Sequence, residues 1–278
     1  MTVPVRQGFF TDTSVCIGCK ACEVACKEWN GVPQAGAPPG EVRALSGLSY
    51  DNSVGLGAST WRHVAFVEQP GTAAGEEDGS GASPFRWLME SDVCKHCTRA
   101  GCLDVCPTGA LVRTEFGSVV VQEGICNGCG YCVPACPYGV IERREGPAGG
   151  PGVGLAQKCT LCYDRLREGS QPACAKACPT DSIQFGALDE LRERAAGRLG
   201  TLVAAGVGAA QLYGEDPGDG VGGAGAFFLL LDEPEVYGLP PDPVVPTRDA
   251  PQMWRRAGLA ALSLAAGTVA AFLPGRRR

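Results

Sequence analysis

DVCKHCTRAGCLDVCPTGAL, residues 92 to 111, contains four cysteines separated as C-x2-C-x4-C-x3-C. Three further groups of four cysteines occur in this chain of 278 residues. The complete set is Cys16, Cys19, Cys22 and Cys26; Cys94, Cys97, Cys102 and Cys106; Cys126, Cys129, Cys132 and Cys136; and Cys159, Cys162, Cys174 and Cys178. None of the 16 cysteines lies outside these groups. The sequence therefore offers four sets of four sulfur ligands.

The spacing inside the groups is typical of iron-sulfur proteins. Three groups start with C-x2-C, continue with a third cysteine and end with a fourth after three intervening residues, the arrangement in which a short loop wraps one 4Fe-4S cluster. The fourth cysteine of such a run usually ligates the other cluster of a pair. Proline follows Cys106, Cys136 and Cys178, where its missing N–H suits a chain that leaves a cluster. Sixteen ligands predict four 4Fe-4S clusters, iron held by all sixteen cysteines, and a role in electron transfer.

Two other uses of cysteine compete with this interpretation. A secreted disulfide framework is disfavoured, because a chain of this length with 45% hydrophobic residues can bury a core without such bonds. Structural zinc prefers two C-x2-C pairs separated by a longer insert. Only the fourth group, from Cys159 to Cys178, resembles that pattern, so zinc stays an alternative for this group alone.

The charge balance argues against a nucleic-acid partner. The net charge is −6 and the isoelectric point is near 5.1, whereas a nucleic-acid-binding protein normally presents a basic face. Basic residues nevertheless gather at the cysteine groups, where a cation stabilises a negatively charged cluster and raises its potential. They are Lys20, Lys27, Lys95, Arg99, Lys158, Arg165, Arg167 and Lys176. Solvated surface side chains are the alternative interpretation for each of them.

The repeated groups predict an α+β fold of two ferredoxin-like dicluster modules with irregular loops, within residues 1 to 205. Residues 59 to 69, STWRHVAFVEQ, and 118 to 122, SVVVQ, have the β-branched and aromatic content of strands. Residues 188 to 196 have a helical pattern. The Gly- and Pro-rich stretches 32 to 40 and 70 to 83 are expected to be surface loops.

The sequence changes character beyond residue 205. Residues 206 to 251 are expected to form an extended linker arm, since their end is rich in proline. Residues 257 to 273 carry no charge, and a transmembrane helix is expected over 252 to 274, followed by a basic tail at 275 to 278. Trp254 would anchor it at the interface. Because alanine dominates this segment, a buried helix of a soluble protein is the alternative.

Three stretches carry a family resemblance: GFFTDTSVCIGCKACEVACKEWN at 8 to 30, the stretch at 92 to 111, and QKCTLCYDR at 157 to 165. They resemble the four-cluster iron-sulfur subunits of molybdenum or tungsten oxidoreductases. YGLPPDP at 237 to 243, followed by one apolar C-terminal helix, is similar to the beta subunit of respiratory formate dehydrogenase. The cysteine runs alone also resemble subunits of dimethyl sulfoxide, polysulfide, thiosulfate and nitrate reductases.

The resemblance implies how the cysteines share four 4Fe-4S clusters. Cluster 1 would be held by Cys16, Cys19, Cys22 and Cys178; cluster 2 by Cys94, Cys97, Cys102 and Cys136; cluster 3 by Cys126, Cys129, Cys132 and Cys106; and cluster 4 by Cys159, Cys162, Cys174 and Cys26. Related subunits that replace one cysteine assemble a 3Fe-4S cluster at that position. All sixteen positions are cysteine here.

The same resemblance implies partners and a location. A catalytic subunit with a pterin-bound metal would oxidise formate and pass electrons to this chain, which would relay them to a membrane cytochrome b or quinone-binding subunit. The protein would then lie at the cytoplasmic membrane, held by a single C-terminal anchor, on a side that stays open. A subunit of another molybdoenzyme and a soluble polyferredoxin are the alternative functions.

The sequence predicts that the protein has no catalytic site of its own. Its two histidines, His63 and His96, have no acid or nucleophile at motif spacing. His96 is expected to be a polar loop residue, and His63 a surface or hydrogen-bonded strand residue.

Overall fold

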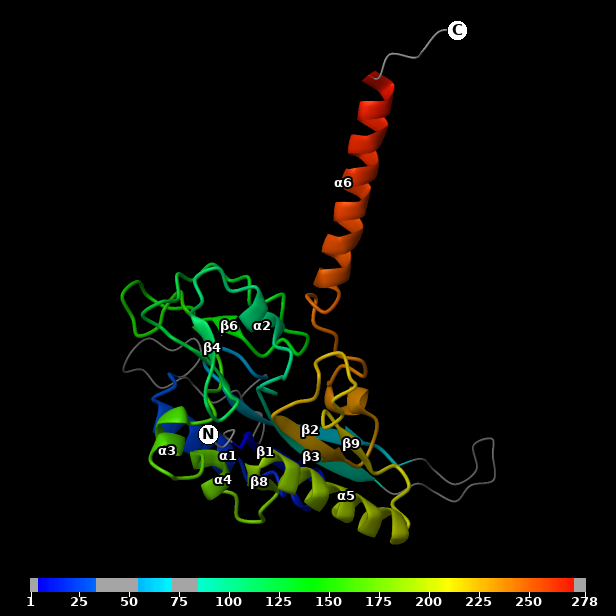
Figure 1. Cartoon of the computed structure of the whole chain (residues 1–278). Helices are drawn as coiled ribbons and strands as arrows, with labels where there is room; N and C mark the ends of the chain where they lie inside the picture. The colour runs from blue at the N-terminus through cyan, green and yellow to red at the C-terminus, as the bar shows by residue number, and fades with distance from the viewer. Residues whose placement is uncertain (1–4, 34–54, 72–84, 273–278) are drawn as a thin grey trace.

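The computed structural model describes residues 5 to 33, 55 to 71 and 85 to 272. Short helices and strands are mixed along the sequence, as expected of an α+β protein, and one long helix projects from the rest (Figure 1). Most of the two expected loops, at 32 to 40 and 70 to 83, lies outside the described residues, as does the basic tail at 275 to 278.

A four-stranded sheet forms the centre of the molecule. Its strands, in order, are β8 (Ile183–Ala187), β1 (Gln7–Asp12), β10 (Ala226–Leu230) and β9 (Gln211–Tyr213). β1 is antiparallel to β8 and parallel to β10, and β9 is antiparallel to β10. Every residue of β10 is buried, because its sequence AFFLL is apolar on both faces, the pattern of a strand that is covered on both sides.

Helix α5 (Leu188–Ala204) covers one face of this sheet (Figure 1). Its buried side chains pack on those of β1 and β10 in a cluster of Phe10, Leu188, Leu191, Ala195, Phe227 and Leu229. The helix predicted at 188 to 196 is thus confirmed and extends further, to Ala204. The opposite face packs on the short helix η2 (Pro234–Tyr237) and on the hairpin described next, through Leu88, Tyr213, Phe228, Leu230, Tyr237 and Leu239.

A two-stranded hairpin is formed by β2 (Arg62–Gln69) and β3 (Arg86–Val93). Arg62 pairs with Val93 at one end and Gln69 with Arg86 at the other. The strand predicted at 59 to 69 is confirmed. The alternation within β2 turns Arg62 to the same side as Val64 and Phe66, which pack into the core cluster around Phe9.

Two smaller hairpins lie apart from the central sheet, near the foot of the projecting helix (Figure 1). They are β4 (Leu111–Arg113) with β5 (Val119–Val121), and β6 (Glu142–Arg143) with β7 (Ala156–Gln157). The strand predicted at 118 to 122 is therefore confirmed as β5. Leu111, Val119, Ile141 and Ala156 form the core of this part, together with cysteines of the second and third groups.

The segment 206 to 251 differs from the extended linker arm that we expected. It supplies β9 and β10, and β10 pairs with β1 in the middle of the central sheet. The physical reason is the apolar run from Ala226 to Leu230, which is most stable when both faces are removed from water. Its proline-rich end, from Pro240 to Thr247, contains no helix or strand, and neither does the stretch from Gly214 to Gly225.

Helix α6 (Ala250–Phe272) forms where an apolar C-terminal helix was expected, and none of its residues is buried. It extends away from the body of the molecule (Figure 1). Among the described residues, no helix combines the length and the apolarity needed to cross a bilayer. The uncharged stretch continues to Leu273, one residue beyond the described range.

Candidate iron-sulfur site

The first and fourth cysteine groups meet where α1 (Ala21–Asn30) packs against α4 (Ala173–Lys176). α1 follows the short helix η1 (Thr13–Val15), and α3 (Tyr163–Arg167) precedes α4. Lys20 and Cys162, immediately before α1 and α3, have positive φ angles of 58° and 47°. These left-handed conformations are costly for residues other than glycine and turn each loop sharply toward the helix that follows.

One cavity at this junction is lined by Cys16, Cys19, Cys22 and Cys178. The other walls include Val64 of β2, Ser91 of β3 and Ser182. The fold thus brings the last cysteine of the fourth group, more than 150 positions away, to the first three of the first group.

A second set of cysteines lies close by. The side-chain amide nitrogen of Asn30 is 3.7 Å from Sγ of Cys26 and 3.8 Å from Sγ of Cys162. Cys159 and Cys174 are buried beside them, and charges on Cys159, Cys174 and Cys162 raise the pKa of Cys26 beyond the effect of its burial. These four thiols therefore share one buried environment.

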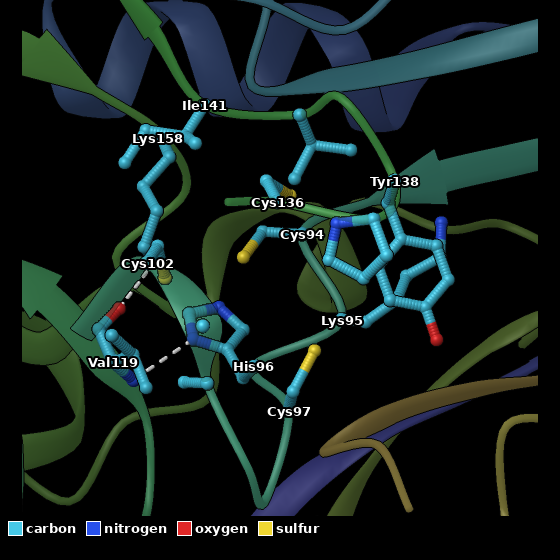
Figure 2. A pocket seen from close by; sticks show the side chains of 14 residues that line it. Cys94, Lys95, His96, Cys97, Cys102, Val119, Cys136, Tyr138, Ile141 and Lys158 are labelled. Carbon is cyan, nitrogen blue, oxygen red and sulfur yellow. Dashed lines mark hydrogen bonds between the residues drawn. The ribbon is translucent and has the colours of Figure 1, made fainter. Parts of the chain in front are cut away.

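A further cavity is lined by Cys94, Cys97, Cys102 and Cys136. Figure 2 shows these four side chains around it, together with Lys95, His96, Tyr138 and Lys158. Cys102 lies on the four-residue helix α2 (Gly101–Asp104), and Cys136 comes from the third cysteine group. The wall is largely apolar elsewhere, including Val119, Val140 and Ile141, so it excludes water from the sulfur atoms.

The remaining set, Cys106, Cys126, Cys129 and Cys132, is partly accessible, like the set of Cys16, Cys19, Cys22 and Cys178. Cys129 is exposed and Cys126 and Cys106 are half-buried, whereas Cys132 is buried. Burial raises the pKa of Cys132 to about 11, and charges on Cys126, Cys129 and Cys106 raise it as well. The four sulfur atoms are therefore neighbours at the edge of the molecule.

Burial also raises the pKa of other thiols in these sets. Burial raises the pKa of Cys102 to about 12 and that of Cys159 to about 12, and neighbouring cysteines add to the rise, whereas Lys158 opposes it. Clustered buried thiolates are unfavourable unless a cationic centre binds them. The donors therefore fit an iron-sulfur cluster, whose iron ions bind one set of four thiolates.

Within the described ranges, no three His, Cys, Asp or Glu side chains are grouped so that they could hold one ion. Two of the four cysteine sets line a cavity each: Cys94, Cys97, Cys102 and Cys136, and Cys16, Cys19, Cys22 and Cys178. The ligand sets themselves stay a prediction at this point.

The predicted basic residues fall into three classes by their exposure to solvent. Lys95 and Lys158 are almost fully buried, and Nζ of Lys158 donates to the carbonyl oxygens of Cys159, at 2.8 Å, and Val119. Lys95 forms an ion pair with Asp92. Of the others, Arg99, Arg167 and Lys176 are exposed, and Lys20, Lys27 and Arg165 are partly or largely buried with protein partners.

Two residues of the site have environments that the sequence did not indicate. His96, expected as a polar loop residue, is in a loop but is buried in the wall of the second-group cavity. Arg62, which was not singled out, is 1% exposed and lies against the first and fourth groups. The position of Arg62 two residues before Val64 in a strand was a usable signal, because it placed the arginine on the core face. His63 is the expected strand residue, buried and 3.7 Å from Glu23.

Comparisons with known proteins agree with this site. Two family models, each described as a 4Fe-4S dicluster domain, match residues 15 to 110 and 85 to 188. Two dicluster domains and sixteen cysteines fit four 4Fe-4S clusters.

Several curated proteins are similar over most of the sequence. The nitrate-inducible formate dehydrogenase iron-sulfur subunit of Escherichia coli (strain K12) is 39% identical over 265 residues, which cover 94% of this chain and 80% of that protein. The formate dehydrogenase iron-sulfur subunit of Haemophilus influenzae is 40% identical over 238 residues, 84% of this chain and 68% of that protein. A subunit of the anaerobic dimethyl sulfoxide reductase of Escherichia coli (strain K12) is 36% identical over 190 residues, 68% of this chain and 77% of that protein. At this level of identity and coverage, the protein belongs to the family of formate dehydrogenase iron-sulfur subunits.

Proposed function

We propose that this protein is the electron-transfer subunit of a membrane-bound formate dehydrogenase. It would relay electrons from a molybdenum- or tungsten-containing catalytic subunit to a cytochrome b or quinone-binding subunit. The observation that carries the proposal is the presence of cysteine-lined cavities in a chain that is 37 to 40% identical to formate dehydrogenase iron-sulfur subunits.

The proposed ligand sets are those implied by the resemblance. Each 4Fe-4S cluster would supply one-electron redox chemistry at a site without a substrate. The protein's own contribution is to bury the sulfur atoms, exclude water and place donors near them. One such donor is the backbone N–H of Leu161, 3.3 Å from Sγ of Cys159. Lys158 contributes a buried positive charge that interacts with Cys94, Cys102 and Cys159.

The experiment is anaerobic purification of the protein with whatever accompanies it, followed by electron paramagnetic resonance before and after addition of formate. Signals of reduced 4Fe-4S clusters that appear with formate would support the proposal. Clusters that respond to dithionite but not to formate would assign the protein to another molybdoenzyme. The similarity to a dimethyl sulfoxide reductase subunit makes that the second candidate function.

The membrane part of the proposal depends on α6. Arg255 and Arg256 precede an uncharged run of 17 residues, and the helix extends away from the body of the protein (Figure 1). We propose that this helix contacts the membrane and its subunit, which would place the protein at the cytoplasmic membrane. Replacing Leu264 by arginine would put a charge in the middle of that run and is expected to release the complex from membranes, whereas Leu264→Ile would not. Membrane fractionation measures this, and full retention of the arginine variant would contradict the anchor.

A further inference from the structure

Arg62 is the first residue of β2. Among the described residues it has the largest fully buried side chain, and that side chain carries a positive charge. Its Nη1 donates to the carbonyl oxygen of Ser91 at 3.0 Å and to the hydroxyl of Ser91 at 2.9 Å. Its guanidinium lies over the ring of Phe9, with Cζ 4.9 Å from the ring centroid. The guanidinium is therefore held in one orientation by β1 and β3.

Two of the three guanidinium nitrogens, Nε and Nη2, have no hydrogen-bond partner among the described residues. The two buried lysines near the cysteines differ in this respect. Lys158 donates to two carbonyl oxygens, and Lys95 is paired with Asp92. A buried cation with free donors is strongly unfavourable unless an anion lies beside it.

The cysteines that act on Arg62 come from both the first and the fourth cysteine group. Burial lowers the pKa of Arg62, but negative charge on Cys174, Cys22, Cys159 and Cys26 raises it, and the net pKa lies above its ordinary value. Ser91 links the guanidinium to one of them, because its hydroxyl is 3.2 Å from Sγ of Cys22. Glu90 on the same strand β3 does not supply the missing anion, because neither of its carboxylate oxygens makes a hydrogen bond to Arg62, and burial, followed by the charge of Asp92, raises its pKa and favours its neutral form.

Cys22 belongs to the proposed ligands of cluster 1, and Cys26, Cys159 and Cys174 to those of cluster 4. We infer that Arg62 is a shared counter-charge for these two clusters, with its free Nε and Nη2 donors directed to their sulfur atoms. This inference rests on the proposed function, because it requires clusters at both sites.

The chemical consequence concerns reduction. Accepting one electron adds one negative charge to a cluster that is already anionic, and a fixed positive charge beside it stabilises the reduced form more than the oxidised form. Arg62 does not titrate in the physiological range, so its effect is the same at every ordinary pH. A single guanidinium therefore raises both reduction potentials together.

The test uses the full-length protein with its partners, purified anaerobically, and measures the midpoint potential of each cluster by paramagnetic resonance during a redox titration with dithionite. Arg62→Gln removes the charge, and Arg62→Lys keeps it. Arg86→Gln is the matched control, because Arg86 is at the other end of the same hairpin, seven residue pairs away. We expect Arg62→Gln to lower two of the four potentials, Arg62→Lys to leave them close to native, and Arg86→Gln to change none.

Iron and acid-labile sulfide are measured in every sample. A native protein without four clusters would overturn the proposed function itself. If the native protein is loaded, unchanged potentials in Arg62→Gln would overturn only the role of Arg62, as would an equal shift of all four. If Arg62→Gln loses iron while Arg62→Lys keeps it, the positive charge is required for assembly, which supports the inference. Loss of iron in both variants would show a packing role instead.

Discussion

The backbone N–H of Val119 donates to Nδ1 of His96 at 3.1 Å, within the wall of the second-group cavity (Figure 2). A neutral imidazole that accepts at Nδ1 carries its proton on Nε2. That nitrogen is buried and has no partner among the described residues. The ring therefore has one unused donor beside Cys94, Cys97, Cys102 and Cys136.

His96 is expected to influence a cluster without changing its own charge. Burial, then the charges of Lys158, Arg6 and Arg113, hold its pKa well below the usual value, so it stays neutral as the pH falls from 8 to 6. Replacing it by phenylalanine should lower one reduction potential, because a donor near sulfur is lost. The native potential should be independent of pH over that range. A native potential that rises as the pH falls to 6 would show protonation and contradict the assignment.

Glu90 makes stability depend on pH. It is fully buried, both carboxylate oxygens lack hydrogen-bond partners among the described residues, and burial followed by the charge of Asp92 raises its pKa well above the usual value. The native protein must therefore protonate Glu90 on folding, at a cost of about 1.4 kcal/mol for each pH unit above the unfolded pKa, until the folded pKa is reached. Glu90→Gln removes this cost. The melting temperature of Glu90→Gln minus that of the native protein should therefore increase as the pH rises from 5 to 8.

Thermal unfolding under anaerobic conditions measures this difference. Glu168→Gln is the control, because Glu168 is an exposed side chain. A difference between Glu90→Gln and native that is constant over the pH range would contradict the buried, protonated carboxyl.

Cys178 tests the contact between the first and fourth groups. It lines the cavity of Cys16, Cys19 and Cys22, so Cys178→Ser should damage the same cluster as a substitution of Cys16. We expect one 4Fe-4S signal to be lost or replaced by a 3Fe-4S signal, with loss of up to about a quarter of the iron. Ser182→Ala, in the same wall, should keep all the iron. Different clusters lost in Cys178→Ser and Cys16→Ser would refute the shared site.

A substitution of Phe228 tests whether β10 is part of the central sheet. Its side chain is completely buried, so truncation to alanine should reduce the free energy of unfolding by about 3 to 5 kcal/mol. Phe272, at the end of α6, is 84% exposed and its replacement by alanine should have little effect on the unfolding of the isolated complex in detergent. Equal melting temperatures for Phe228→Ala and native would restore the interpretation of 206 to 251 as a linker arm.

The local features of this protein were readable in the sequence. Cysteine spacing depends on how a loop of a few residues wraps a cluster, so C-x2-C runs indicated iron-sulfur binding without any tertiary information. The strands at 59 to 69 and 118 to 122 and the helix from Leu188 followed from side-chain pattern in the same way. Each of these patterns lies within one helix, strand or loop, so it can be recognised without knowing which segments pack against it.

Other features depended on contacts between distant segments. Phe10 of β1 lies beside Phe227 of β10, 217 positions later, and the apolar run of β10 does not by itself indicate which strand it pairs with. The same applies to the burial of His96, a polar residue of a loop, and of Arg62, whose place in the strand indicates the core face but not the residues that enclose it. Their environment is created by β1, β3 and β5, and only the folded protein decides that a charge or a donor is enclosed next to sulfur. Burial is a property of all the segments that surround a residue, whereas ligand spacing is a property of one.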